Sequence, residues 1–201
     1  WGTWISNSHY VDSLPTWVDS LNAKEYGSVY INRDWTLLND ASSYFEADTS
    51  VVKTPEARKH IGQKLASMVR GIVKPRKAQR DFSSLLENPF GITYTKDMAI
   101  EAIIGEELGK DEHTDLLSIT FTSTRLIGEK YGPHSIEMED VYLRLDKDLA
   151  HLIKLLNTEI GKQNYLLILT SDQGVASSPN HLEKSKIPGG YFEPQDRKSV
   201  V

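Results

Sequence analysis

The 201-residue chain has a formal net charge of -5 at pH 7, and 39% of its residues are hydrophobic and 25% charged. This length allows one substantial core, and the composition is that of an ordinary globular protein rather than a disordered or fibrous one. The acidic balance argues against nucleic-acid binding, the lack of cysteine excludes disulfide and thiol chemistry, and neither a signal peptide nor an apolar run of membrane-spanning length is recognised.

The first part of the chain is rich in tryptophan. Trp1 and Trp4, together with Ile5, predict an edge strand after a turn. Pro15 suits the first turn of a helix whose apolar side is formed by Leu14, Trp17, Val18 and Leu21. Tryptophan rings can stack on a sugar or a base, but packing in a core is the more common role. Because the pattern begins abruptly at Trp1, we expect a missing amino-terminal portion.

Residues 31–92 read as an insertion or cap-like region. Its first part, residues 31–53, is polar with short apolar groups, which is typical of irregular structure that covers a cleft. Thr54 and Pro55 then predict a helix start, and the helix should end near Gly71. A run without acidic residues follows from position 58 to position 80 and contains Arg58, Lys59, Lys64, Arg70, Lys74, Arg76, Lys77 and Arg80. It could contact phosphate groups or an anionic surface, but it lacks aromatic residues, so a solvated helix face is favoured.

The region from 93 to 174 predicts a strand, a helix and a second strand. Before it, Asn88-Pro89-Phe90-Gly91 indicates a turn, and Thr95 caps a helix that should stop near Gly109, with Gly105 packed against a sheet. Residues 116–121 and 166–170 are dense in Leu, Ile, Phe and Thr, which predicts core strands buried on both faces.

The apolar residues between these two strands change their spacing to three and four, which predicts one buried helix face made of Val141, Leu145, Leu149, Leu152, Leu156 and Ile160. The opposite face is filled mostly by Arg144, Asp146, Lys147, Asp148 and Lys154. A strand, crossover helix and strand form a right-handed parallel unit, in which ligands gather at the carboxyl ends of the strands. Those ends are residues 122–129 and 171–174, and residues 175–201 are expected to be a loop or mobile arm.

The segment STRLIGEKYGPHSIEMEDVYLRLDKDLAHLIKLLNTEIGKQNYLLILTSDQG resembles the alkaline phosphatase superfamily, in particular its bacterial type I phosphodiesterase and nucleotide-pyrophosphatase-like phosphatases. Family members have a Ser-Thr-Asp-x-x-Gly-His strand end, a Gly-Pro-x-Ser turn, a helix with Tyr-Leu-Arg-Leu-Asp and an Asp-His-Gly strand end. WISNSHYVDSLPTWVDSLN and NPFGITYTKDMAIEAIIGEELGKDEHTD are similar to the family as well. The resemblance implies an α/β fold with a partial parallel-sheet core of the alkaline-phosphatase type and a helical or irregular insertion, so that residues 1–201 form a single partial domain.

The resemblance also implies a chemistry, the two-zinc hydrolysis of phosphate esters, and four ligand positions for the zinc ions. Here those positions hold Arg125, Glu129, Asp172 and Gln173, so only Asp172 is unchanged. A guanidinium cannot ligate a cation. At an effective dielectric of about 20, holding the guanidinium about 4 Å from a divalent ion would cost roughly 8 kcal/mol. We therefore expect no zinc in this chain.

Two alternatives to zinc remain at these positions. An oxygen-rich Mg²⁺ or Ca²⁺ site could form on Glu129 and Asp172. The favoured alternative is that Arg125 pairs with Asp172 or Glu129 and supplies in place the positive charge that metal gives in the family. In the family, earlier segments bring the nucleophile, a further zinc ligand and phosphate-holding side chains, and a later segment brings the last histidine. His181 is the lone candidate for that histidine and is expected to be a surface residue.

Three functions follow from the sequence. The favoured one is a divergent or truncated phosphatase-like protein that no longer hydrolyses phosphate esters. The others are a part of an active metal-dependent phosphatase or phosphodiesterase, and a non-catalytic module that binds an anion or a protein. The expected partners are a phosphate or phosphate-ester ligand at Arg125, and a second copy or a missing chain segment that covers the open sheet. By resemblance alone, the location is periplasmic or extracellular.

Overall fold

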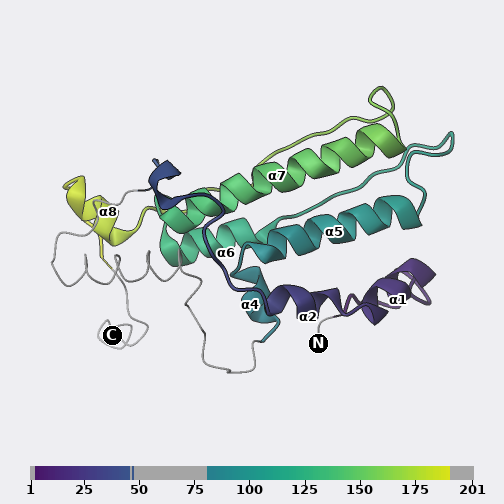
Figure 1. Cartoon of the computed structure of the whole chain (residues 1–201), viewed down its shortest axis with the longest axis horizontal. Coiled ribbons are helices and arrows are strands. Elements are labelled where there is room, and N and C mark those ends of the chain that lie inside the picture. The colour runs from purple at the N-terminus through teal and green to yellow at the C-terminus, as the bar shows by residue number, and fades with distance from the viewer. Residues whose placement is uncertain (1–2, 46, 48–80, 191–201) are drawn as a thin grey trace, which may run out of the picture.

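The computed structural model describes residues 3–45, 47 and 81–190, and this part of the chain is helical (Figure 1). The elements are, in chain order, α1 (Thr16–Ala23), α2 (Tyr26–Ile31), the 3-10 helix η1 (Ala41–Ser43), α4 (Ser83–Leu86), α5 (Phe90–Gly105), α6 (Thr122–Tyr131), α7 (Ile136–Glu159) and α8 (Pro179–Lys184). The two long helices, α5 and α7, lie side by side and run in the same direction, and α6 packs against the beginning of both. None of the described helices is long and apolar enough to cross a bilayer.

Helix α7 is the central element, and its predicted apolar stripe is confirmed. Ser135 caps the amino terminus, where its side chain accepts a hydrogen bond from the Met138 amide at 3.2 Å, and acidic residues occupy the first turn. Val141, Leu152 and Leu156 are buried, as the spacing predicted. The opposite, charged face is less exposed to solvent than expected. The side chains of Arg144 and Asp148 are each only 15% exposed.

Helices α5, α6 and α7 enclose two apolar clusters. The first contains Ile92, Ile127, Met138 and Val141 and joins the beginnings of α5 and α7 to the middle of α6. The second contains Ile103, Leu152 and Leu156 and lies toward the carboxyl ends of α5 and α7. Because the buried faces of α5 and α7 meet along their length, the two helices form one layer.

Trp4 and Trp17 pack, as favoured, against other parts of the protein, but no strand forms among residues 3–11. Trp4 lies against the Tyr94 ring with 5.3 Å between centroids. Helix α1 buries Val18 and Leu21, as predicted. A Cβ on Gly105 would lie 2.4 Å from Cγ of Trp17, so Gly105 allows α5 to approach α1. The expectation that Gly105 packs against a sheet is therefore wrong.

Helix α5 begins five residues earlier than the predicted cap at Thr95 and ends at Gly105 rather than near Gly109. The Asn88 side chain accepts a hydrogen bond from the Phe90 amide at 3.0 Å, so the expected turn is itself the helix start. Thr95 instead donates its hydroxyl to the Gly91 carbonyl one turn back. Gly109, with φ of 73°, belongs to the turn beyond the helix.

The two predicted strands are present as extended segments, but the described residues form no β-sheet. The prediction that they are buried on both faces is wrong, since Leu116 is 93% and Leu166 is 85% exposed. Each segment returns along the helix layer, and both run in the same direction (Figure 1). A strand needs a paired neighbour to be assigned to a sheet, and no described segment lies in pairing contact with either one. The predicted helix from Thr54 to Gly71 and the basic run from 58 to 80 fall outside the described residues.

Candidate functional site

The end of the first predicted strand, residues 122–129, lies in helix α6. Helix α6 starts at Thr122, directly after the first extended segment, and Thr124 donates its hydroxyl to the Phe121 carbonyl at 2.8 Å. Arg125 and Glu129 stand one turn apart on this helix, and Nη1 of Arg125 donates to Oε1 of Glu129 at 3.1 Å. The prediction that Arg125 pairs with Asp172 or Glu129 is therefore confirmed for Glu129.

The Arg125 and Glu129 side chains are 44% and 49% exposed. An exposed pair at this helical spacing stabilises the fold by only about 0.3–0.5 kcal/mol. The pair therefore contributes little to stability. Its consequence is chemical, because one oxygen of the Glu129 carboxylate is already bound to a guanidinium.

The second predicted strand end lies in an exposed loop. Asp172 and Gln173 are exposed, and the hydroxyl of Ser171 donates to the Gln173 carbonyl at 3.2 Å. Within the described part of the chain, no ion pair joins Asp172 to Arg125. Nor does the described part hold three or more His, Asp or Glu side chains close enough together to bind one metal ion.

Close contacts bring the two strand-end regions against each other. A Cβ on Gly128 would lie 2.9 Å from Cγ2 of Val175, so the chain after Gly174 passes directly over α6. Gly132 follows the last residue of α6 with φ of 88°, and a Cβ on it would lie 3.4 Å from Cβ of Ser178, at ordinary contact distance. The regions that follow the two extended segments are thus neighbours, as their order in the sequence predicted.

The described part of the tail, residues 175–190, contains the short helix α8, where only a loop or mobile arm was expected. Its His181 ring stacks on His134, from the turn between α6 and α7, with centroids 4.0 Å apart and planes 19° apart. His181 is half-buried, so the expectation of a surface histidine is wrong. Nothing in the spacing of the six histidines indicated this pair, since it depends on how the tail folds back.

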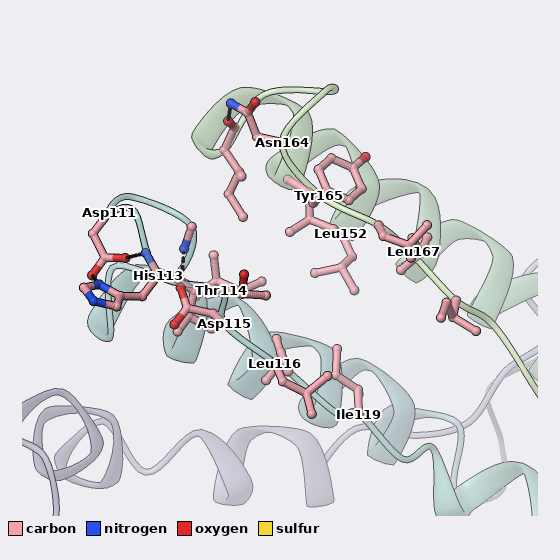
Figure 2. A pocket seen from close by; sticks show the side chains of 18 residues that line it. Asp111, His113, Thr114, Asp115, Leu116, Ile119, Leu152, Asn164, Tyr165 and Leu167 are labelled. Atoms are coloured by element: carbon pink, nitrogen blue, oxygen red, sulfur yellow. Dashed lines mark hydrogen bonds and ion pairs between the residues drawn. The ribbon is translucent and has the colours of Figure 1, made fainter.

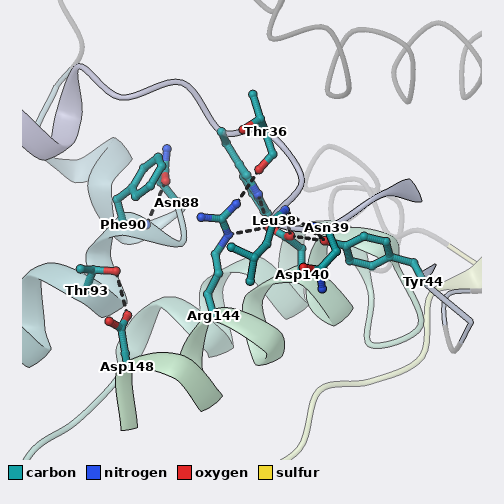
Figure 3. A network of polar contacts seen from close by, with 11 residues as sticks. Thr36, Leu38, Asn39, Tyr44, Asn88, Phe90, Thr93, Asp140, Arg144 and Asp148 are labelled. Carbon is teal, nitrogen blue, oxygen red and sulfur yellow. Dashed lines mark hydrogen bonds and ion pairs between the residues drawn. The ribbon is translucent and has the colours of Figure 1, made fainter. Parts of the chain in front are cut away.

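Figure 3 shows a polar network around the buried carboxylate of Asp140, which no local pattern in the sequence indicated. Asp140 is fully buried on α7 and accepts hydrogen bonds from the Trp35 indole at 2.7 Å, the Leu38 amide at 2.7 Å and the Tyr44 hydroxyl at 2.5 Å. It also accepts from Nε of Arg144 at 2.7 Å. Burial, and then the bond to Asp140, raise the pKa of Tyr44 to about 12. Asp140 thereby fixes the irregular segment 34–45 to α7.

A second buried network joins α2, α5 and α7. Lys96 is 4% exposed, and its ammonium group pairs with Asp97 and, at 3.7 Å, with Asp148. Its Nζ also lies 3.3 Å from Nδ1 of His151. Tyr30 donates to Asp97, and burial together with this bond raises its pKa. The charges in this network compensate one another, which indicates a structural role.

Sequence comparisons find known proteins that are similar to this chain. Residues 3–197 match the family model for type I phosphodiesterases and nucleotide pyrophosphatases. The alkaline phosphatase PhoV of Synechococcus elongatus is 39% identical over 94% of this chain and 34% of its own. The alkaline phosphatase PafA of Elizabethkingia meningoseptica is 34% identical over 99% of this chain and 36% of its own.

Solved structures show the same relation. The structure resembles a crystal structure of a substituted variant of PafA with a TM-score of 0.79 and 30% identity, over 98% of this chain and 38% of that one. The neighbouring fold is thus the α/β fold of an alkaline phosphatase. The chain spans about a third of the length of the curated relatives it matches. It belongs to the type I phosphodiesterase and nucleotide pyrophosphatase family of the alkaline phosphatase superfamily.

Proposed function

We propose that this chain is a divergent member of its family that holds no zinc and does not hydrolyse phosphate esters. The observation that carries the proposal is the ion pair between Arg125 and Glu129. By the family resemblance, both residues occupy positions that bind zinc in family members. Here one of the two positions is a cation, and the other gives its carboxylate to that cation.

The chemistry of the remaining side chains supports the same conclusion. Zinc sites use Cys, His and carboxylate ligands, and a structural or catalytic site takes three or four of them from the protein. Among the residues that the structure describes, the four positions supply one carboxylate that pairs with no cation, Asp172, and one amide, Gln173. These donors do not fit a two-zinc centre, and the Arg125 charge would repel a divalent ion by roughly 8 kcal/mol at about 4 Å.

The proposed ligand is a phosphate or phosphate-ester group, held by the fixed charge of Arg125 without reaction. The guanidinium is half-exposed, and its remaining N–H donors suit the geometry of a phosphate. We further propose a periplasmic or extracellular location, which rests on the family resemblance.

The test is the zinc content of the purified chain after equilibration with excess zinc and removal of free metal. We expect less than about a tenth of an equivalent, because one carboxylate cannot retain zinc against washing. The informative variant is Arg125→Asp/Glu129→His/Gln173→His, which restores the family residues and should raise the retained zinc. Lys147→Asp, an exposed charge reversal on α7, is the matched control and should retain no more than the parent.

Two outcomes would overturn the proposal. One or two tightly held equivalents of zinc in the unmodified chain would favour the alternative that it is part of an active metal-dependent phosphatase. Zinc-dependent release of phosphate from an aryl phosphate by the same preparation would do so as well. Saturable binding of inorganic phosphate without metal, weakened by Arg125→Ala, would favour the anion-binding role over a chain that has simply lost its chemistry.

A further inference from the structure

The turn between α6 and α7 carries a histidine whose ring stacks on a histidine of α8. The ring centroids of His134 and His181 lie 4.0 Å apart, and the ring planes differ by 19°. His134 is exposed, and His181 is half-buried. This histidine pair joins the tail to the helix layer and has no part in the function proposed above.

We propose that the histidine pair is a pH-sensitive switch, which holds the tail on α6 at neutral pH and releases it in acid, when both imidazoles are charged. The loop that carries Asp172 and Gln173 leads directly into the tail. Release would therefore also free this loop and uncover the side of α6 that carries Gly128. The switch works in the same way whether or not the chain holds zinc.

The tail meets α6 and the following turn at successive points. A Cβ on Gly128 would lie 2.9 Å from Cγ2 of Val175, and a Cβ on Gly132 would lie 3.4 Å from Cβ of Ser178. The histidine pair comes next along the tail. The first two contacts join carbon atoms and do not change with pH, so the ring stack is the contact among these that responds to protons.

Helix α8 depends on this docking because it is short. It spans only Pro179–Lys184, and the Ser178 side chain caps it by accepting a hydrogen bond from the His181 amide at 3.4 Å. A helix of this length does not repay its nucleation cost in water, where isolated helices need about 12 residues or more. When the tail leaves α6, we therefore expect α8 to unfold, so its amide protons report whether the tail is docked.

The direction of the pH dependence follows from the charges on the two rings. Histidine is the side chain that ordinarily gains its proton between about pH 5 and 8. One proton on the pair is tolerated, because a cation is attracted to the face of a neutral aromatic ring. A second proton places two positive charges about 4 Å apart, which at an effective dielectric of about 20 would shift the docking equilibrium roughly 1,000-fold.

Solvent around the exposed His134 weakens that repulsion, and we expect a shift of about tenfold or more. The released tail accepts the second proton without this repulsion, so it binds more protons than the docked tail. By linkage, docking is complete at neutral pH and is lost as the pH falls.

Charged neighbours on the elements at the pair do not cancel this repulsion. They are Arg125, Glu129 and Lys130 on α6, Glu137 and Glu139 in the first turn of α7, Asp172 before the tail, and Glu183, Lys184 and Lys186 on and after α8. Glu129, Lys130 and Glu139 are engaged with other groups. Within the described part of the chain, His134 forms no ion pair with a carboxylate, whereas His113 does with Asp111. The lysines at the end of α8 add positive charge on the side of release.

The experiment is an NMR titration of the 201-residue chain from about pH 8 to about pH 5. One readout is the contact between the Val175 methyl group and the α-protons of Gly128. The other is amide exchange at Leu182 and Ile187, which donate to the Ser178 and Leu182 carbonyls, with each rate divided by that of an unfolded peptide at the same pH. We expect the contact to be lost in acid and the protection to fall by at least about tenfold, while the amides of α7 keep theirs.

Three variants separate the second charge from the stack itself. His134→Phe keeps an aromatic ring but allows only one charge, so the tail should stay docked to about pH 5. His134→Ala removes the ring and should lower the protection of α8 at neutral pH as well. His113→Phe is the matched control, because the side chain of His113 is 90% exposed and lies at a pocket away from the tail (Figure 2), and it should titrate like the parent.

The remaining outcomes also decide the question. Release of the tail from His134→Phe at the same pH as from the parent would overturn the proposal, since this variant cannot carry the second charge. A tail that stays docked while the ring chemical shifts report both imidazoles as protonated would overturn it too. Loss of protection in α7 together with α8 would mean that acid unfolds the whole chain, which also contradicts a switch confined to the tail.

Discussion

Replacing Asp140 tests whether the buried carboxylate holds the segment 34–45 against α7. Asp140→Ala removes one acceptor and leaves the Trp35 indole, the Leu38 amide and the Tyr44 hydroxyl without it. It also leaves the Arg144 guanidinium, whose side chain is only 15% exposed, without its carboxylate.

The magnitude follows from these lost partners. Removing one member of a buried ion pair costs about 3–5 kcal/mol, and each buried neutral donor left unsatisfied costs about 1–3 kcal/mol unless water reaches it. Because the segment 34–45 can lift and let water enter, we expect a total near the ion-pair value, about 3–5 kcal/mol. At a urea m-value of about 2 kcal/mol/M, the unfolding midpoint would fall by roughly 1.5–2.5 M.

The assay is urea unfolding followed by far-UV circular dichroism, with Asp146→Ala as the matched control. Asp146 is exposed on the same helix, so its replacement should change the free energy of unfolding by less than about 0.5 kcal/mol. Amide exchange adds a local readout, since the Leu38 amide should exchange faster in Asp140→Ala than in the parent. A loss below about 1 kcal/mol for Asp140→Ala, or an unchanged Leu38 amide, would refute the reasoning.

Three further changes test other features. Ser135→Ala removes the cap of α7 and should lower the free energy of unfolding by about 1 kcal/mol in urea titrations; no change would mean that water replaces the cap. Gly105→Ala places a Cβ 2.4 Å from the Trp17 ring and should cost about 1–3 kcal/mol, whereas Gly174→Ala, which meets no atom within 4 Å, should cost far less. The pKa of Tyr44 rises from 10.0 to about 12, so the stability it contributes is complete below pH 10 and is lost as the pH rises toward 12. Tyr44→Phe should flatten that decline, and an equally steep decline in both proteins would contradict it.

Local patterns predicted the helices better than the rest of the structure. The stripe from Val141 to Ile160 predicted α7 because a period of three to four residues fixes which face is buried. The same reasoning missed α6, since the predicted strand, helix and strand assigned its residues to a strand end. The predicted sheet was not found among the described residues. Local patterns could not test that prediction, because strand pairing depends on segments that are distant in the sequence.

The candidate site was predictable only where residues lie close in the sequence. Arg125 and Glu129 are four apart, so one helical turn brings them together. Asp140 was missed because three of its four donors come from residues about a hundred positions earlier in the chain. The stacking of His134 on His181 was missed for the same reason, since only the path of the tail places the two rings together.

The charge at Arg125 does not depend on the concentration of free metal, whereas the charge of a bound ion does. An ion site fills and empties with the concentration of free metal, and a chelator removes its charge. A guanidinium is covalently attached and stays protonated at every pH at which proteins are folded. The end of the first extended segment therefore carries one positive charge whether metal is scarce or abundant, and no chelator can remove it.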